Sequence, residues 1–503
     1  MELLLYNSLT GKLEKFLHDK SKPIKWYTCG PTVYSSAHLG HARTFISFDV
    51  IRRVLTYLGY TINYVMNITD IDDKIINKVK ELSGNNEVDT DIYMQFIAKM
   101  ELEFWNDMDK LNVMRPNVVT RVTEYIERMK KFAEKIEQNG LAYVSNGTLY
   151  VDSEKYMKHG LTWDLFDRNI INDHNDHTEN EFSAEKKNKP DFALWKASKP
   201  GEIKFESKWG FGRPAWHLEC SVMSNDIHGE VIDIHSGGID LLYPHHNNEM
   251  IQSMAFNPHN TTPIKMFLHS GHLNINGEKM SKSLKNFITI NDFINNVGSG
   301  QLLRILFLIH SWNKPMDFTD GTVNEAKLIE KRLIDFYTNI EHILRTGKKT
   351  ITQYNEKDNQ FLEQLVKLKG NVNYLLLKNI DTKNIMMVLL EMITEIYKYT
   401  ESDYNTILVQ NSFDFISTIL NVFGLDFTIQ NTNTNADKFI DLLVNFREDV
   451  RITIKKNIKE IPKNVVTEIF KVLDDLRDNK LKDEGIMIED NVKGQTVKWK
   501  KID

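Results

Sequence analysis

Cysteine is scarce in this sequence: only two occur among 503 residues, Cys29 and Cys220, and they lie far apart. This scarcity excludes a secreted scaffold of disulfide-linked loops and favours reduced thiols or metal ligands. Long uncharged hydrophobic runs are also missing, and the N-terminus has no basic stretch followed by an apolar one. These absences argue against a secretion signal and membrane-spanning helices, and they predict a cytoplasmic protein with no membrane partner.

No excess of one charge marks the chain, whose net charge is −6 with 63 basic and 69 acidic residues. This balance gives no general signature of nucleic-acid binding, although a local basic face could still bind RNA. The composition, 41% hydrophobic and 26% charged, is that of a globular protein. The length predicts two to four domains, and no internal repeat is visible.

What the sequence does contain is a strand–helix–strand pattern near its start. Residues 24–28 and 61–68 read as strands, and 41–55 reads as a helix with apolar residues at helical spacing. This is the βαβ unit from which parallel sheets are built. Ligands of such sheets bind beyond the carboxyl ends of the strands, which is where Cys29 and the segment 67–74 fall.

The rest of the chain predicts an α/β architecture in three parts. A Rossmann-type parallel-sheet catalytic domain is expected over residues 1–295, with a connective insertion at about 85–191. The sheet is expected to resume further along the chain, at 205–220, 231–238 and 264–275. Amphipathic helices then predict an α-helical bundle at 296–430, and a small C-terminal α+β module is expected at 437–503.

Two histidines, His38 and His41, stand three residues apart at the expected start of the first helix. A helix N-terminus attracts phosphate through its free N–H groups and positive dipole. Two imidazoles there could donate hydrogen bonds to charge that develops on a phosphorus, and Gly40 would let a flat base approach the backbone. Taken alone, the pair is equally compatible with two surface histidines on a helix cap.

The segment Lys279–Ser283 predicts a loop between a strand and a helix, because it follows Asn276-Gly277. The ammonium groups of Lys279 and Lys282 could close on a polyphosphate and neutralise a leaving pyrophosphate. By itself it could be an ordinary basic loop. The histidine pair and this loop have the order and separation needed to act on one nucleotide, which makes coincidence much less attractive.

A third group consists of Cys29, Cys220, His245 and Glu249. His245 and Glu249 are four residues apart after a proline, so they would share one face of a helix. Two thiolates, an imidazole and a carboxylate form a ligand set that zinc accepts. The neighbouring His246 competes for the imidazole position, but on a helix its side chain should point about 100° away. The alternative is that the cysteines are merely small apolar side chains.

These motifs resemble a known family. His38-Leu-Gly-His41 and Lys279-Met-Ser-Lys-Ser283 are similar to the two signature motifs of class I aminoacyl-tRNA synthetases. Longer strings resemble the cysteinyl-tRNA synthetases within that class, namely 27–34, 67–74, 191–196, 212–220, 235–249 and 484–500.

The resemblance implies a role for each matching residue. One zinc ion per chain would be bound by Cys29, Cys220, His245 and Glu249, and ATP would enter as a substrate with Mg²⁺. His38 and His41 would contact the triphosphate of ATP, and Lys282 would also contact ATP. The residues near the adenosine would be Gly237, Gly238 and Asp240. Thr69 and Trp216 would line the amino-acid pocket.

The implied activity is ligation of L-cysteine to tRNA(Cys), through cysteinyl-adenylate and then transfer to the 3′-terminal ribose. Packing separates cysteine from serine by only ~1–3 kcal/mol, so a metal that binds the substrate sulfur would supply the discrimination. The insertion is then expected to have no hydrolytic role, and the C-terminal module to recognise the anticodon. A monomer is expected.

Two alternatives remain at this point. One is a cysteine ligase that passes cysteinyl-adenylate to a small amine, although such relatives look truncated after the catalytic domain. The other is a non-catalytic RNA-binding protein with structural zinc, which would not need the Lys279–Ser283 loop together with both histidines.

Overall fold

A computed structural model describes residues 2–84, 88–166, 185–260, 262–279, 286–346, 353–427, 434–489 and 498–501. The chain divides into two compact units. The first comprises Met1–Lys327, Gly370–Val388 and Val422–Leu425, and the second Leu328–Lys369, Leu389–Asn421 and Asp426–Asp503. Among the described residues, no helix is both long and apolar enough to cross a membrane.

The first unit is built on a parallel sheet with strand order β12-β11-β3-β4-β5. Its strands are β3 (Ile24–Thr28), β4 (Ile62–Ile68), β5 (Val118–Arg121), β11 (Ile232–Gly238) and β12 (Ile264–Ser270). The helix α1 (Leu39–Tyr57) connects β3 to β4. The βαβ unit expected from the sequence is therefore confirmed.

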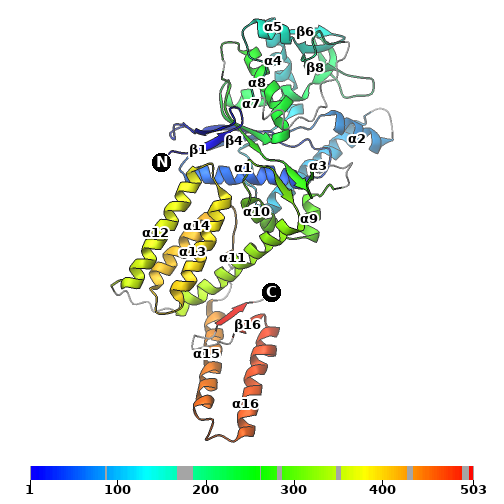
Figure 1. The fold of residues 1–503 in the computed structure, drawn as a ribbon. Helices are drawn as coiled ribbons and strands as arrows, with labels where there is room; N and C mark the ends of the chain where they lie inside the picture. Colours follow the sequence, from blue (N-terminus) through cyan, green and yellow to red (C-terminus); the bar gives the residue numbers. More distant parts are fainter. Residues whose placement is uncertain are drawn as a thin grey trace. The chain divides into compact units, whose positions relative to one another are not determined.

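Helices cover both faces of this sheet, as Figure 1 shows. On one face lie α1 and α10 (Gly300–Leu308); on the other lie α4 (Ile126–Gln138), α7 (Trp216–His228) and α8 (Asn247–Phe256). Trp26 of β3 is fully buried, and its ring packs edge-on against Phe48 of α1. Because both faces are covered, most residues of the central strands β3, β4 and β11 are buried, including the polar Asn67, His235 and Ser236.

The prediction that the parallel sheet resumes at 205–220 is wrong. The chain forms two short strands, β9 (Phe205–Ser207) and β10 (Gly210–Pro214), and then the helix α7, which carries Cys220. These strands join a separate sheet with order β6-β7-β8-β10-β9, whose other members are β6 (Ala142–Ser145), β7 (Thr148–Val151) and β8 (Ala193–Ala197). Ala215 N donates to Leu194 O, which holds the start of α7 against that sheet.

Other elements complete the first unit. They are β1 (Leu4–Asn7), β2 (Lys12–Lys15), α2 (Asp73–Ser83), α3 (Thr90–Lys110), α5 (Ser153–Lys158), β13 (Leu273–Ile275), β14 (Glu278–Lys279), α9 (Ile290–Asn296) and β15 (Met316–Phe318). The buried Arg304 of α10 ties several of them together: its guanidinium pairs with Asp49 of α1 at 2.7 Å and donates to the carbonyls of Leu111 and Phe423.

The second unit is mainly helical, in agreement with the expected α-helical bundle. It takes in parts of α11 (Asp320–Thr346), α12 (Glu356–Leu377), α13 (Thr382–Thr400) and α14 (Thr406–Val422). Between α12 and α13 the rings of Phe361 and Tyr399 stack, with their centroids 4.0 Å apart.

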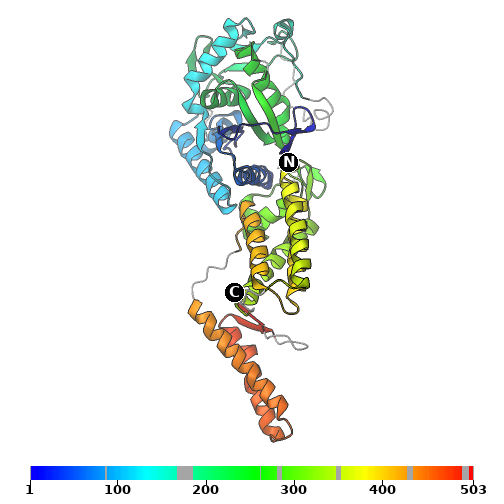
Figure 2. The ribbon, with the colours of Figure 1, turned by 90° about the vertical axis from the view of Figure 1, so that its left-hand side faces the viewer.

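The C-terminal part of the second unit contains α15 (Thr434–Lys456), α16 (Lys463–Asp475), a turn of wide helix (Leu476–Lys480), α17 (Leu481–Asp483) and the hairpin β16–β17 (Ile486–Glu489 and Lys498–Lys501). Figure 1 shows α15 and α16 side by side, and in the view of Figure 2, turned by 90°, they overlap. The fully buried Arg447 of α15 donates to the carbonyl of Leu473 in α16. The mixed helix and strand content agrees with the expected α+β character.

Candidate active site and metal centre

A cavity of about 340 Å³ opens where β3, β4 and β11 end at the carboxyl edge of the parallel sheet. Ten of the residues predicted from the sequence line it: Cys29, His38, Gly40, His41, Thr69, Trp216, Cys220, Gly238, Asp240 and His245. These residues come from positions more than 200 apart in the chain, so the fold brings them to one place.

The histidine pair, His38 and His41, forms the first turn of α1. His38 Nδ1 accepts hydrogen bonds from the backbone N–H groups of Gly40 and His41, at 3.0 and 3.4 Å. In return, His41 Nδ1 accepts from His38 N at 3.3 Å, which completes a reciprocal capping box. Each Nδ1 is therefore an acceptor, so in the neutral ring the proton must sit on Nε2.

The geometry of the histidine pair makes both rings neutral donors. The two rings stack with centroids 3.8 Å apart. Burial lowers the pKa of His41 well below its ordinary value, and the nearby His38 adds to this effect. No acidic side chain occupies the first turn of α1. The pair is thus suited to donate hydrogen bonds from Nε2–H to an anion at this end of the cavity.

At the end of β11, neighbouring side chains pack directly against the backbone of two glycines. A Cβ at Gly237 would lie 2.8 Å from Leu241 Cδ1 and 2.9 Å from His246 Cε1, and a Cβ at Gly238 would lie 2.3 Å from Asp240 Oδ1. A side chain at either position would therefore force its neighbours to move. Gly238 and Asp240 line the cavity, whereas Gly237 lies behind them at the strand end.

The predicted basic loop is described only at its start. Lys279 closes the short strand β14, which pairs with β13 through Asn274. Lys282 lies outside the described residues.

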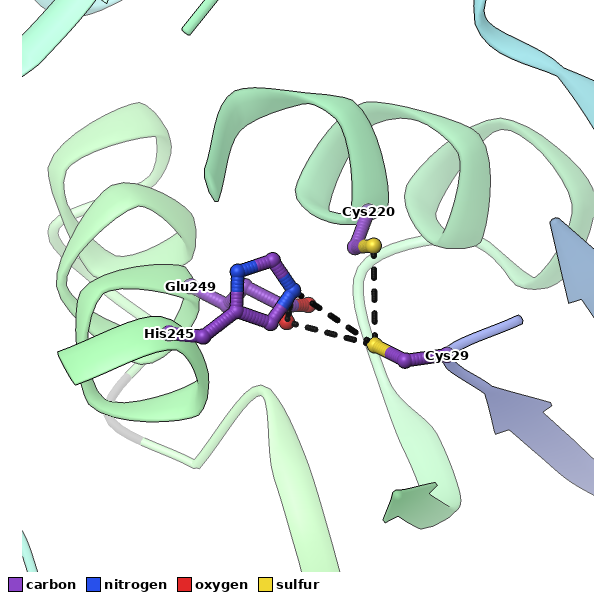
Figure 3. A group of neighbouring side chains, drawn as sticks. All are labelled: Cys29, Cys220, His245 and Glu249. Carbon is purple, nitrogen blue, oxygen red and sulfur yellow. Dashed lines mark hydrogen bonds and ion pairs between the residues drawn. The ribbon is translucent and has the colours of Figure 1, made fainter. Parts of the chain in front are cut away.

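The cysteine cluster consists of Cys29, Cys220, His245 and Glu249, whose side chains converge in Figure 3. Cys29 Sγ lies 3.5 Å from Cys220 Sγ, 3.6 Å from His245 Nε2 and 3.7 Å from Glu249 Oε1. Ligand atoms around a tetrahedral zinc, at about 2.0–2.3 Å from the metal, stand roughly 3.3–3.8 Å apart. The three distances from Cys29 therefore match such an ion, and all four donor atoms lie within 4.8 Å of one another.

Two members of the cysteine cluster, Cys220 and Glu249, favour their negatively charged forms, which suits a bound cation. Burial opposes the thiolate of Cys220, but the hydrogen bond from Cys29 and the nearby His245 lower its pKa to about 6. Burial likewise opposes the carboxylate of Glu249, yet His235 and His245 lower its pKa to about 2.

The other two members of the cluster shift in the opposite sense. Burial raises the pKa of Cys29 well above its ordinary value, and the negative charge of its neighbours adds to the shift. Burial would lower the pKa of His245, but Glu249 and Cys220 raise it to about 10. A divalent cation would take the place of the His245 proton and would also favour the Cys29 thiolate.

Neighbouring side chains orient His245. Its Nδ1 lies 2.9 Å from His217 Nδ1, and its ring centroid is 4.4 Å from that of Trp216. These contacts leave His245 Nε2 facing Glu249 Oε1 at 3.0 Å. Sequence reasoning missed His217, although its place three residues before Cys220 on a helix puts both on one face.

The expectation that His246 points away from the cluster is wrong. His246 Nε2 lies 3.4 Å from Cys29 Sγ, and with His235, Cys29 and Glu249 it forms a second group able to hold a metal. The reason is local: residues 242–246 form a wide turn with Tyr243 extended, and the regular helix begins only at Asn247. The regular 100° step therefore does not apply. His235 was also missed, although it stands near the end of a buried strand.

The two groups differ in their exposure to the cavity. Cys29, Cys220 and His245 line it, whereas His235 and His246 do not. His246 Nδ1 is also engaged with His269 Nε2 at 2.6 Å. An ion that must meet a molecule in the cavity is therefore better placed in the cysteine cluster.

Comparison with known proteins agrees with this geometry. The family model described as tRNA synthetases class I (C) catalytic domain matches residues 15–328. The cysteine--tRNA ligase of Encephalitozoon cuniculi is 42% identical over 502 residues, which cover 99% of each chain. The chain belongs to the cysteine–tRNA ligase family. A cytoplasmic cysteine--tRNA ligase of Dictyostelium discoideum is 38% identical over 530 residues, covering 99% of this chain and 78% of that one.

Solved structures of this class share the fold. Methionyl-tRNA synthetase of Mycobacterium tuberculosis, in complex with methionyl-adenylate, superimposes with a TM-score of 0.59 at 12% identity, over 80% of this chain and 90% of that one. The α/β Rossmann-type fold predicted from the sequence is thus confirmed. As a class I aminoacyl-tRNA synthetase, this cysteine–tRNA ligase family member is an enzyme that uses ATP with Mg²⁺, an amino acid and tRNA.

Proposed function

We propose that the protein ligates L-cysteine to tRNA(Cys) in two steps, ATP-dependent formation of cysteinyl-adenylate and transfer of the cysteinyl group to the 3′-terminal ribose. The observation that carries this proposal is the shared cavity, which is lined both by the histidine pair and by three members of the cysteine cluster. A cysteine whose sulfur meets the cluster has its carboxylate free to face an ATP bound at the histidine pair.

In the first step the substrate carboxylate attacks the α-phosphorus of ATP and pyrophosphate leaves. No protein nucleophile is needed, because positioning and charge neutralisation suffice. His38 and His41 would donate Nε2–H to the phosphates, and Gly40 would let the nucleotide approach α1. Lys279 and Lys282 would neutralise the leaving pyrophosphate, while Gly237, Gly238 and Asp240 would lie near the adenosine.

At the other end, Cys29, Cys220, His245 and Glu249 would hold one zinc ion. When bound, zinc supplies affinity for a thiolate sulfur that the hydroxyl of serine cannot match. Thr69 and Trp216 would line the amino-acid pocket beside it. Discrimination of about 10⁴-fold corresponds to roughly 5.5 kcal/mol and would make a separate editing activity unnecessary.

The remaining parts have assigned roles in this proposal. Residues 1–295 form the catalytic domain, and the insertion at about 85–191 contacts the acceptor end of tRNA without hydrolytic activity. The helical region at 296–430 contacts tRNA, and the module at 437–503 recognises the anticodon. We infer a cytoplasmic monomer, a location that the name of the Dictyostelium relative supports.

Transfer to a small amine has less support, because the Encephalitozoon relative matched along 99% of the chain is named as a cysteine--tRNA ligase. The test is aminoacylation of total tRNA with labelled cysteine and, in parallel, labelled serine, with a small amine offered in a third reaction. Cysteine should be charged and serine should be about 10⁴-fold poorer. Labelled amide without charged tRNA would overturn the proposal.

A further inference from the structure

Arg43 is a buried arginine on α1 that lies two residues after His41 and does not line the cavity. Its Nη2 donates to the carbonyls of Ser311, at 3.3 Å, and of Lys314. Its Nε and Nη1 have no hydrogen-bond partner in the described part of the chain, and no carboxylate there pairs with it. Burial lowers the pKa of Arg43 to about 9, so the group is still charged at neutral pH. An unpaired buried charge costs stability, which is typical of a residue that serves function.

The carbonyls that Arg43 holds belong to a turn, 311–314, that packs on Gly271. Gly271 N donates to Trp312 O at 2.9 Å. A Cβ at Gly271 would lie only 2.1 Å from Lys314 O, so the turn lies directly against the glycine backbone. Arg43 and Gly271 therefore meet at the same Lys314 carbonyl.

Gly271 belongs to a wall of the cavity formed by residues 270–273, all four of which line it. The wall begins at Ser270, the last residue of β12, which pairs with Gly238 of β11. It therefore continues the surface of Gly238 and Asp240, which would lie near the adenosine in the proposed function. A glycine in such a wall lets a flat ring approach the backbone.

We propose that Arg43 is a positioning residue that fixes this wall, through the turn at 311–314, for the adenine ring of ATP. This inference rests on the proposed function. The guanidinium suits the task because it is planar and presents several donors in a fixed geometry, so it can hold two carbonyls at once. Arg43 would not touch ATP, since it does not line the cavity. A change at Arg43 should therefore weaken the hold on the adenosine and spare the phosphates, which the histidine pair would bind.

The experiment separates the adenosine from the phosphates by comparing two ligands. ATP and inorganic tripolyphosphate share the triphosphate chain, but only ATP has the adenosine. Their dissociation constants for the full-length enzyme are measured by calorimetry, with Mg²⁺ and without amino acid. The readout is the adenosine preference, defined as the dissociation constant of tripolyphosphate divided by that of ATP.

Two variants of Arg43 separate its hydrogen bonds from its bulk. Arg43→Met keeps the length of the side chain but removes every donor. It should lower the adenosine preference about 10- to 100-fold, because a small displacement of a binding wall has an effect of that size. Its binding of tripolyphosphate should stay within about 3-fold of wild type. Arg43→Lys keeps a donor for the Lys314 carbonyl, so its preference should also stay within about 3-fold of wild type.

Gly271→Ala disturbs the same contact from the other side. The backbone at Gly271 does not have a positive φ, so the added Cβ close to Lys314 O is the disturbance. This variant should push the turn and the wall apart and lower the adenosine preference. Its combination with Arg43→Met should lower the preference little further, because both changes break one contact.

Arg52 supplies the matched control. It lies on the same helix and also donates to two carbonyls, those of Met114 at 3.3 Å and Arg115 at 2.8 Å. That segment does not line the cavity. Arg52→Met removes the same donors and should leave the adenosine preference unchanged.

Three results would overturn the inference. The first is an unchanged preference in Arg43→Met. The second is an equal loss of both ligands in Arg43→Met, which would make Arg43 a charge that attracts the phosphates. The third is an equal fall in preference in Arg52→Met, which would make the effect a general destabilisation.

Thermal unfolding is measured for each variant. If Arg43→Met does not fold, Gly271→Ala keeps the test decisive, because an unchanged preference there would equally overturn the inference. If wild-type protein binds neither ligand, the proposed function fails. If wild type prefers ATP and Arg43→Met keeps that preference, only this inference fails.

Discussion

The histidine pair and the cysteine cluster share one cavity but are assembled in opposite ways. His38 and His41 lie within one turn of α1, and each ring caps the backbone of the other. The cluster instead draws Cys29 from the end of β3, Cys220 from α7, and His245 and Glu249 from the region of α8. One site is a local motif and the other is a product of the whole sheet domain.

This difference predicts separable failures. A change in the histidine pair should affect phosphate chemistry while the cluster keeps its metal, because no cluster residue depends on the cap of α1. A change in the cluster should remove metal and sulfur recognition while α1 keeps its cap. The following predictions test that separation in order of expected effect.

The largest effect is expected for Cys220→Ser. Loss of a thiolate ligand should remove most of the zinc and lower the rate of cysteine-dependent ATP–pyrophosphate exchange at least about 100-fold. Even the loss of a residue that only hydrogen-bonds to a metal ligand lowers metal affinity or activity about 10- to 100-fold. Metal analysis and exchange rates measure this. Ser224→Ala, one helical turn further along α7, is the control and should keep about one zinc per chain. Full activity in Cys220→Ser would refute the metal's role in sulfur recognition.

His38 offers a way to separate capping from chemistry. Both His38→Ala and His38→Asn lose the Nε2–H donor, so each should lower kcat for exchange about 10²- to 10³-fold with zinc retained. Asparagine is a good N-cap, whereas alanine should cost about 1 kcal/mol of the free energy of unfolding. Denaturant unfolding measures the second quantity. If His38→Asn recovers activity along with stability, the histidine acts only as a cap.

The smallest effect is expected for His246→Gln, which tests the choice between the two metal groups. His246 should act beside the bound metal and not as a ligand, so its loss should weaken zinc affinity only about 10-fold. His245→Gln should weaken it considerably more. Competition with a zinc chelator measures both affinities. A greater loss for His246→Gln would move the metal to the group that contains His235.

The parallel-sheet start of the chain was predictable because its signals are local. Apolar periodicity indicated the strand at 24–28 and the first helix, and the two histidines were expected at the start of that helix. The segment 205–220 was mistaken for a strand region because short apolar runs look alike in strands and helices. Only contact with the second sheet places Pro214 in a strand and Cys220 on a helix.

The sequence by itself determined the class of fold, the family resemblance and the His245–Glu249 pair, since each depends on residue type at a given spacing. The fold brings that pair to Cys29 and Cys220, which lie 191 positions apart. Tertiary structure alone decided which further groups join them. His246 enters the cluster because a wide turn precedes α8, and Arg43 meets the turn at 311–314 because α1 packs against α10 and β13. Hydrogen bonds between residues up to 271 positions apart leave no periodic trace in the sequence, so these partners appear only when the chain is folded.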